Sequence, residues 1–456
     1  MSDRGAWSSK IGFILAGAGS AIGLGAIWRF PYMTGDNGGA LFVILFLICC
    51  FFIGYPVMIA ELSLGRNTEK NPVGMFRKLT AGKGRIWKMV GGLCVLSGFT
   101  IFSWYSVIAG WVLGYFYKTV SGAFNTVLSN EAIDGIFDSF VGNAFTVMSL
   151  HALVIFMTGF VVYRGVKAGI ETLSKWLMPL LFVLLILLAF RSVTLEGAGE
   201  GLRFYLYPDF SKFSGIVILK AMGQALFSLS LGMGTMITYG SYLSKNESIY
   251  KSAAWITFFE ILVCILAGFV ILPAVAAMNQ SYAQGPDLIF KVLPSIFASM
   301  PGGYFFGIGF FVLIIIAAIT STVSILEVPV AYFVDEKKWN RSKSVFFVGF
   351  IAWLIGTPAA LSSGASEFWS SLPGIGLSFF DIISTAFGDI SLSIGAFFIA
   401  IFVAWKWGVD KASEEIESDG NTFKIKAVWG FLIRYVAPIT IFIVFANVIW
   451  GTFFGD

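Results

Sequence analysis

The stretch Gly17-Ala18-Gly19-Ser20-Ala21-Ile22-Gly23-Leu24-Gly25 decides the fold, because it places glycines inside an apolar run from Ile11 to about Met33. That run is long enough to cross a bilayer as a helix. Each glycine weakens a helix by roughly 1 kcal/mol relative to alanine. Irregular backbone at membrane depth survives only where protein buries it or where it lines a cavity. We therefore predict a membrane helix interrupted near its middle, whose freed carbonyl and N–H groups could hold a cation or a polar ligand. Close packing of small residues between helices is the alternative interpretation.

A second interruption lies in the other half of the chain. Ser228-Leu229-Ser230-Leu231-Gly232-Met233-Gly234 falls inside an apolar span from about Gly215 to Tyr242. Two interrupted spans in corresponding positions of two halves are typical of transporters, whose binding site lies where two structural repeats meet. The pair of interruptions therefore favours a transport site over simple helix packing.

The composition restricts the class of protein. The chain has 456 residues, of which 57% are hydrophobic, 17% aromatic and only 12% charged. This composition predicts an all-α polytopic membrane protein without a separate soluble domain. The glycine-rich stretch follows no predicted strand, which excludes a dinucleotide-binding loop. No nucleophile–base pair or metal cluster suggests an enzyme, and nothing suggests a nucleic-acid partner. We expect a lipid bilayer and a small-molecule substrate as the partners.

Hydropathy predicts eleven spans in a single transmembrane domain. They cover about residues 11–34, 40–65, 87–118, 144–163, 168–191, 214–242, 252–278, 303–334, 343–361, 377–407 and 425–453.

Charge in the short loops predicts the orientation. Lysine and arginine concentrate in alternate loops, which places those loops on the cytoplasmic side of a cell membrane. These residues are Lys70, Arg77, Lys78, Lys83, Arg85, Lys88, Arg164, Lys167, Lys245, Lys251, Lys337, Lys338, Arg341, Lys343, Lys411 and Lys424. With eleven spans, the N-terminus is then cytoplasmic and the C-terminus lies outside.

Several motifs resemble the neurotransmitter:sodium symporter family and its LeuT-like bacterial members. They are Gly23-Leu-Gly-Ala-Ile-Trp-Arg-Phe-Pro-Tyr32, Ala60-Glu-Leu-Ser-Leu-Gly-Arg66, the stretch from Gln224 to Gly234, Ile319-Thr-Ser321 and Gly408-Val-Asp-Lys-Ala412. The resemblance covers nearly the whole chain. It implies a 5+5 inverted repeat with broken helices one and six. The first repeat would cover about 11–191 and the second about 214–407, followed by an eleventh span at about 425–453. It also implies alternating access and sodium-coupled uptake.

The resemblance also implies site residues. One sodium site, which looks intact, would use Gly19, Ile22, Ala317, Thr320 and Ser321. The substrate pocket would comprise Ser20, Ala21, Gly23, Gly25, Ile101, Tyr105, Phe227, Ser228, Ser230, Met233, Ser321 and Ile325. The inner gate would pair Arg4 with Asp335, backed by Trp7 and Tyr242, and the outer gate would involve Arg29 and Gln224.

The chain departs from the family pattern at a second sodium site. Members usually carry Asn at the position of Ala26 and Asn or Asp at that of Glu260. The altered site would retain Ala21, Ser228 and Glu260. Because an acid near this position accompanies chloride independence in the family, chloride is not expected as a cofactor.

Three further positions can be compared with the family pattern, one at the outer gate and two in the substrate pocket. The aspartate that usually pairs with Arg29 is replaced at the matching position by Ser384, so we predict Asp381, one turn earlier, as the partner. Met233 replaces a common phenylalanine and leaves a softer pocket. Gly23 stands where amine-transporting members carry aspartate, which favours an apolar or aromatic substrate over a cationic amine.

Glu260 raises a question of coupling, because its charge would lie near the position of a substrate carboxylate. Two negative charges at about 5–6 Å repel by roughly 3 kcal/mol at an effective dielectric of 20. Sodium could still bind, with Glu260 in place of the missing amide. Alternatively, Glu260 is protonated, since burial favours a neutral carboxyl group. In the third case the substrate lacks a carboxylate. These cases leave three functions: sodium-coupled uptake of a small apolar or aromatic amino acid, transport of a neutral indole-like ring with weak or altered sodium coupling, or a sensor with this fold that does not transport.

Overall fold

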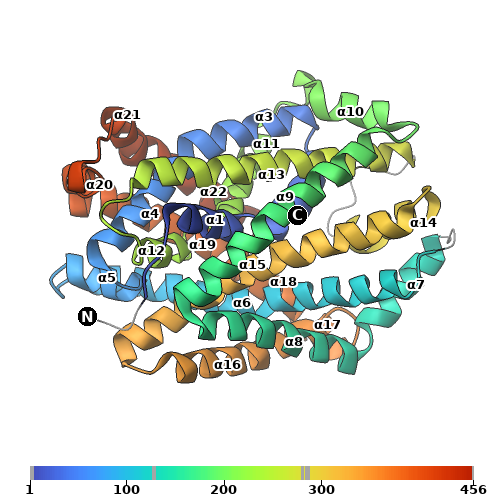
Figure 1. The fold of residues 1–456 in the computed structure, drawn as a ribbon, viewed down its shortest axis with the longest axis horizontal. Coiled ribbons are helices and arrows are strands. Elements are labelled where there is room, and N and C mark those ends of the chain that lie inside the picture. The colour runs from blue at the N-terminus through green and yellow to red at the C-terminus, as the bar shows by residue number, and fades with distance from the viewer. Residues whose placement is uncertain (1–4, 126–129, 279–281, 283–287, 454–456) are drawn as a thin grey trace.

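The computed structural model describes residues 5–125, 130–278, 282 and 288–453. Within these ranges the regular structure is entirely helical. Figure 1 shows the long helices running roughly along one axis, with short helices at both ends of the bundle. The predicted all-α membrane architecture is confirmed.

Nine helices in the described ranges are long and apolar enough to cross a membrane. In several of them a π-helical turn joins two α-helices into one span. They are α3–α4 (Ala40–Thr68), α6 (Arg85–Val120), α8 (Ala144–Tyr163), α9 with its preceding turn (Val166–Val193), α13 (Ile249–Ala277), α15 (Gly303–Lys337), α16 (Arg341–Leu361), α18–α20 (Phe379–Ile416) and α21–α22 (Lys426–Gly451).

Shorter helices lie between the spans along the chain. They are α5 (Pro72–Leu79), α7 (Asn130–Val141), α10 (Ala198–Leu206), α14 (Leu293–Ser299) and α17 (Glu367–Ser370). In Figure 1, α5 lies at the end marked N, and α7 and α10 lie at the opposite end.

The first predicted span is a broken helix. Its first half, α1 (Lys10–Ala21), begins after Ser9, whose side chain caps the helix by accepting the N–H of Gly12. The second half runs through a π-helical segment, Gly25–Arg29, into α2 (Phe30–Asp36). The two halves are bent by 53°. The glycine-rich stretch therefore interrupts the helix where the sequence predicted.

The sixth predicted span is broken as well. Its halves are α11 (Gly215–Ser228) and α12 (Thr235–Gly240). Between them, Ser230, Gly232 and Gly234 have φ angles of 54°, 87° and 78°. Glycine adopts this left-handed region without steric cost, and a Cβ at Gly232 would overlap the carbonyl oxygen of Leu392. The backbone therefore leaves the helix here because both its conformation and its close packing require glycine.

Hydrogen bonds hold the two breaks together. The Ser230 hydroxyl donates to the carbonyl of Ser20 at 3.0 Å, which joins one break directly to the other. Glu61, fully buried on α4, accepts the N–H of Gly232 at 2.7 Å. Gln224 donates its amide N–H to the carbonyl of Gly25 at 2.8 Å. Since backbone groups freed inside a membrane need partners, these side chains make the broken conformation stable.

Replacement of Glu61 by alanine should destabilise the protein. It removes the acceptor of a buried N–H group, a loss that costs about 1–3 kcal/mol. We expect a clearly lower thermal unfolding temperature in detergent for Glu61→Ala and a smaller decrease for Glu61→Gln, whose amide oxygen can still accept. Ser63→Ala is the matched control, because the Ser63 hydroxyl donates only to a carbonyl of its own helix. Equal stability of Glu61→Ala and Ser63→Ala would contradict this role.

Candidate functional site

A central cavity lies between the two breaks. Its lining residues are Ser20, Ala21, Gly23, Gly25, Ile101, Tyr105, Phe227, Ser230, Met233, Ser321, Ile325 and Leu392. Every residue of the predicted pocket except Ser228 is among them, and Leu392, on α19 (Ser391–Ile401), is an addition. Ser228 is not among the lining residues, and its hydroxyl donates to Glu260 on α13, its predicted neighbour in the altered site.

The cavity combines apolar walls with polar groups at the first break. Ile101 on α6, Phe227 on α11 and Met233 in the break between α11 and α12 contribute hydrophobic surface. The Tyr105 hydroxyl oxygen accepts the N–H of Leu24 at 2.8 Å, so this ring is fixed against the broken backbone. An enclosed apolar space with a few convergent polar groups is the usual form of a small-molecule site.

Tyr105 and Phe227 separate this cavity from a larger one. The central cavity has a volume of about 30 Å³ and the neighbouring outer cavity about 220 Å³. The outer cavity is lined by Leu24, Gly25, Trp28, Arg29, Tyr32, Trp104, Tyr105, Ile108, Phe227, Phe380, Asp381, Ser384, Gly388 and Asp389. Only Gly25, Tyr105 and Phe227 line both cavities. The two aromatic rings therefore form the partition between them.

An ion pair lies next to this partition, but with a partner that differs from the prediction. The Arg29 guanidinium bonds to the Asp389 carboxylate at 3.1 Å and lies over the Phe227 ring, 4.5 Å from its centre. The predicted pairing of Arg29 with Asp381 is wrong. Asp381 lies in the first turn of α18 (Phe379–Ser384), where its carboxylate accepts a hydrogen bond from Ser378 at 2.6 Å.

The physical reason for this error is a π-helical turn. Residues Thr385–Ile390 form such a turn between α18 and α19. It has a different period from a regular helix. A count of positions along an unbroken α-helix therefore does not give the face on which Asp389 lies.

Four of the five predicted residues of the intact sodium site are brought together. The Ser321 hydroxyl reaches the carbonyls of Gly19 and Ser20 at 3.4 and 3.3 Å. The hydroxyl of Thr320, the adjacent residue on α15, donates to the carbonyl of Ala317 at 3.1 Å. The Thr320 Cβ lies 3.2 Å from the position that a Cβ at Gly19 would occupy. Ile22, the fifth, follows directly after the end of α1. Neutral carbonyl and hydroxyl oxygens suit a hard cation.

The predicted altered site contains a buried carboxylate with one unused oxygen. Glu260 is fully buried, and one of its oxygens accepts hydrogen bonds from Ser228 and, at 3.3 Å, from the Cys264 thiol. The other oxygen is buried without a hydrogen-bond partner among the residues that the structure describes. Ala21, the third predicted member, lines the central cavity. The arrangement leaves an acceptor that a cation or a proton could use.

Trp7 packs at the end of the bundle near the N-terminus. Its indole N–H donates to the carbonyl of Tyr239 at 3.0 Å, and its ring lies against Tyr242 with 6.4 Å between ring centres. Tyr242 in turn donates to Glu327 at 2.7 Å. Asp335 accepts hydrogen bonds from the backbone and the side chain of Asn71. Arg4, its predicted partner, lies outside the described residues.

The sequence analysis missed Glu327 at this end of the bundle and Leu392 in the central cavity. Glu327 is a fully buried carboxylate on α15 that binds both Tyr242 and Arg341. An ionisable residue within an apolar span is a recognisable signal of function, so Glu327 could have been found. Leu392 carries no comparable signal, because one leucine among many in an apolar span does not stand out.

Comparison with known proteins gives consistent matches. The model of the sodium:neurotransmitter symporter family matches residues 4–133 and 131–452. The chain is 40% identical to an uncharacterized sodium-dependent transporter, YhdH, of Bacillus subtilis, over 97% of each chain. It is 35% identical to an uncharacterized sodium-dependent transporter of Haemophilus influenzae, over 97% of this chain and 98% of the relative. The crystal structure of MhsT in complex with L-phenylalanine is similar with a TM-score of 0.89 and 42% identity, over 98% of this chain and 100% of MhsT.

Removal of both hydroxyls from the predicted sodium site should abolish stabilisation by sodium. We expect sodium chloride, compared with potassium chloride, to raise the unfolding temperature of the native protein but not that of Thr320→Ala/Ser321→Ala, which lacks two oxygen ligands. Thr357→Ala is the control, because the Thr357 hydroxyl bonds only to its own helix. Undiminished sodium stabilisation in the double variant would rule out this assignment.

Loss of the Phe227 ring should weaken substrate binding. The ring covers the central cavity from the outer side, so Phe227→Ala opens the cavity to water. We expect at least a tenfold loss of affinity for a solute that binds in the central cavity, about 1.4 kcal/mol, measured by scintillation proximity. Phe380→Ala serves as the control, because Phe380 lines only the outer cavity. Equal affinities of the native protein and Phe227→Ala would disprove the proposed role of the ring.

Proposed function

The chain belongs to the sodium:neurotransmitter symporter family, and from this premise we propose that it couples sodium entry to the uptake of a small apolar or aromatic amino acid. The observation that carries this proposal is the central cavity between the two broken helices. Its walls are apolar and its polar groups gather at the first break. MhsT, which shares the fold, was crystallised with L-phenylalanine, and this supports a substrate of the same chemical class.

Ser321 connects the substrate cavity with the proposed sodium site. It lines the cavity, and its hydroxyl reaches the carbonyls of Gly19 and Ser20 at the first break. A sodium ion held by Gly19, Thr320 and Ser321 would fix the same backbone that forms the cavity wall. Binding of either ligand would then reduce the ordering cost of the other, which is the physical basis of coupling.

Alternating access requires a barrier on each side of the cavity. Tyr105 and Phe227, backed by the Arg29–Asp389 pair, supply the outer barrier. Trp7, held by the carbonyl of Tyr239, supplies the inner one. We place the N-terminus and the inner barrier on the cytoplasmic side, in agreement with the positively charged loops. The division into two repeats at about 11–191 and 214–407 belongs to the same proposal.

Glu260 favours a second candidate function. Among the described residues, one oxygen of Glu260 has no hydrogen-bond partner. Position 26 holds alanine and position 260 glutamate, where family members usually carry Asn and Asn or Asp. If Glu260 binds sodium in place of the missing amide, an amino acid remains the substrate and chloride is not needed. If Glu260 holds a charge without sodium, its repulsion favours a substrate without a carboxylate, such as indole. The first arrangement is the main proposal because it keeps the two sodium ions and the substrate in the positions that the family uses.

A comparison of tryptophan with indole should separate the two candidates. The main proposal predicts that tryptophan binds more tightly as sodium rises from micromolar to millimolar concentration, while indole gives no response. The measurement is thermal stabilisation of the purified protein by each ligand in sodium or potassium buffer, with sodium chloride and sodium gluconate compared to test for chloride. Binding of indole alone, independent of sodium, would overturn the main proposal.

Transport itself needs a separate measurement. Proteoliposomes with an inward sodium gradient should accumulate labelled amino acid, and collapse of the gradient should stop the accumulation. Binding without accumulation, in vesicles shown to contain folded protein, would identify a sensor with this fold.

A further inference from the structure

An apolar groove on the outside of the bundle shares no lining residue with the central cavity. It runs between α8 and α16, which pack side by side at the lower edge of Figure 1. The α8–α16 groove has a volume of about 420 Å³. Its lining residues are Ala152, Ile155, Phe156, Gly159, Phe160, Tyr163, Ser342, Val345, Phe346, Gly349, Phe350 and Trp353. Apart from Ser342 and the tip of Tyr163, these residues present only hydrocarbon and aromatic surface.

Two glycines keep the groove open. A Cβ at Gly159 would lie 3.4 Å from Val345, and one at Gly349 would lie 3.2 Å from Ile155. Larger residues at these positions would therefore fill the space between the helices. Arg341 fixes the spacing at one end, because its guanidinium donates to the carbonyl of Val162 at 2.6 Å. The groove is thus a feature of the folded bundle and not a gap between loose side chains.

The groove has the length of one membrane leaflet. From Ala152 to Tyr163, and equally from Ser342 to Trp353, it extends over twelve residues, which are separated by eleven helical steps. At a rise of 1.5 Å per residue this is about 16 Å. Half of a hydrocarbon core of about 30 Å is about 15 Å. A single acyl chain that enters from one interface and ends near the midplane would therefore match it.

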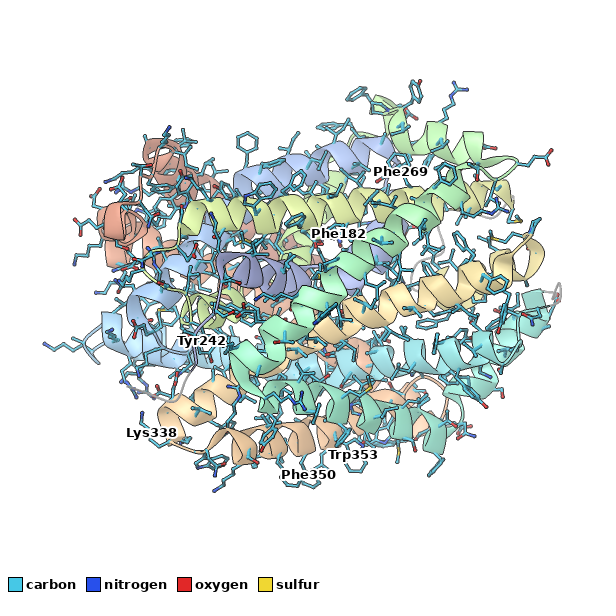
Figure 2. All side chains as sticks on the ribbon, in the orientation of Figure 1. Phe182, Tyr242, Phe269, Lys338, Phe350 and Trp353 are labelled. Carbon is cyan, nitrogen blue, oxygen red and sulfur yellow. The ribbon has the colours of Figure 1, made fainter. Side chains whose placement is uncertain are left out.

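Positive charge gathers at one end of the groove. Arg164 follows directly after α8, and its guanidinium lies over the ring of the groove residue Phe160 at 4.5 Å. Lys343 lies in the first turn of α16, above the Trp339 ring at 4.3 Å. Neither forms an ion pair with an acidic residue in the part of the chain that the structure describes. Figure 2 shows Phe350 and Trp353 along the outer edge of α16 and Lys338 toward this charged end.

We propose that the α8–α16 groove binds one anionic phospholipid, with an acyl chain between Gly159 and Gly349 and its phosphate against Arg164 and Lys343. Among the described residues the two cations have no acidic partner, and a phosphate supplies the missing negative charge. A second copy of this chain fits the groove less well. A two-fold interface centred on the groove would bring the cations of both copies to one place, where like charges repel.

The test compares two lipids with the same acyl chains. Dioleoyl phosphatidylglycerol should raise the unfolding temperature of the full-length protein in detergent by several degrees more than dioleoyl phosphatidylcholine does. Native mass spectrometry should show one retained phosphatidylglycerol. Arg164→Gln/Lys343→Gln should lose this preference. Lys406→Gln/Lys411→Gln is the matched control, because it removes two exposed lysines near α20, which lies away from α16 (Figure 1).

A second variant tests the apolar part of the groove. Gly159→Leu fills the groove and should reduce retention of phosphatidylglycerol at least tenfold, whereas Gly92→Leu, at a glycine with open space around it, should not. Dihexanoyl phosphatidylglycerol, which carries the headgroup on short chains, should stabilise poorly. The proposal would be overturned by equal effects of the two dioleoyl lipids or by an unchanged lipid preference in the charge variant. It would also be overturned by full stabilisation with the short-chain lipid, or by a dimer that covers the groove in place of a lipid.

Discussion

The hydrogen bond from the Ser230 hydroxyl to the carbonyl of Ser20 joins the two broken helices, and the rest of the site depends on it. A membrane interior offers no water to backbone groups that leave a helix, so each break needs partners from the protein. Glu61 and Gln224 supply two of these partners, to Gly232 and Gly25. Because the breaks satisfy one another, they lie side by side, and the cavity forms between them.

This arrangement gives the two proposed ligands a common wall. The backbone near Gly19 and Ser20 faces α15 on one side and the central cavity on the other, and Ser321 touches both. A protein with separate pockets for ion and solute would need a longer chain of contacts to couple the two binding events. Here one short stretch of irregular backbone can respond to either ligand. In our proposal, Tyr105 and Phe227 close this space on its outer side and Trp7 closes it on its inner side.

The sequence predicted this architecture well where its signals were local. Glycines within apolar spans predicted both breaks, and the motif resemblance named nearly every residue around the cavity. Sequence and structure differ where the period of a helix changes or where a side chain has two potential partners. The π-helical turn at Thr385–Ile390 places Asp389 rather than Asp381 beside Arg29. Ser228 turns toward Glu260 and leaves the cavity to Leu392. The choice of partner depends on three-dimensional packing, which spacing along the chain does not encode.

The central claim is that sodium and substrate bind to one shared structure. The most direct measurement is the affinity of the purified protein for L-phenylalanine at low and saturating sodium, together with its affinity for sodium with and without L-phenylalanine. Thermodynamic linkage requires each ligand to change the affinity for the other by the same factor. The account predicts a large and equal factor, at least tenfold in both directions. A factor of one in both directions would mean that the two ligands bind independently and would contradict it.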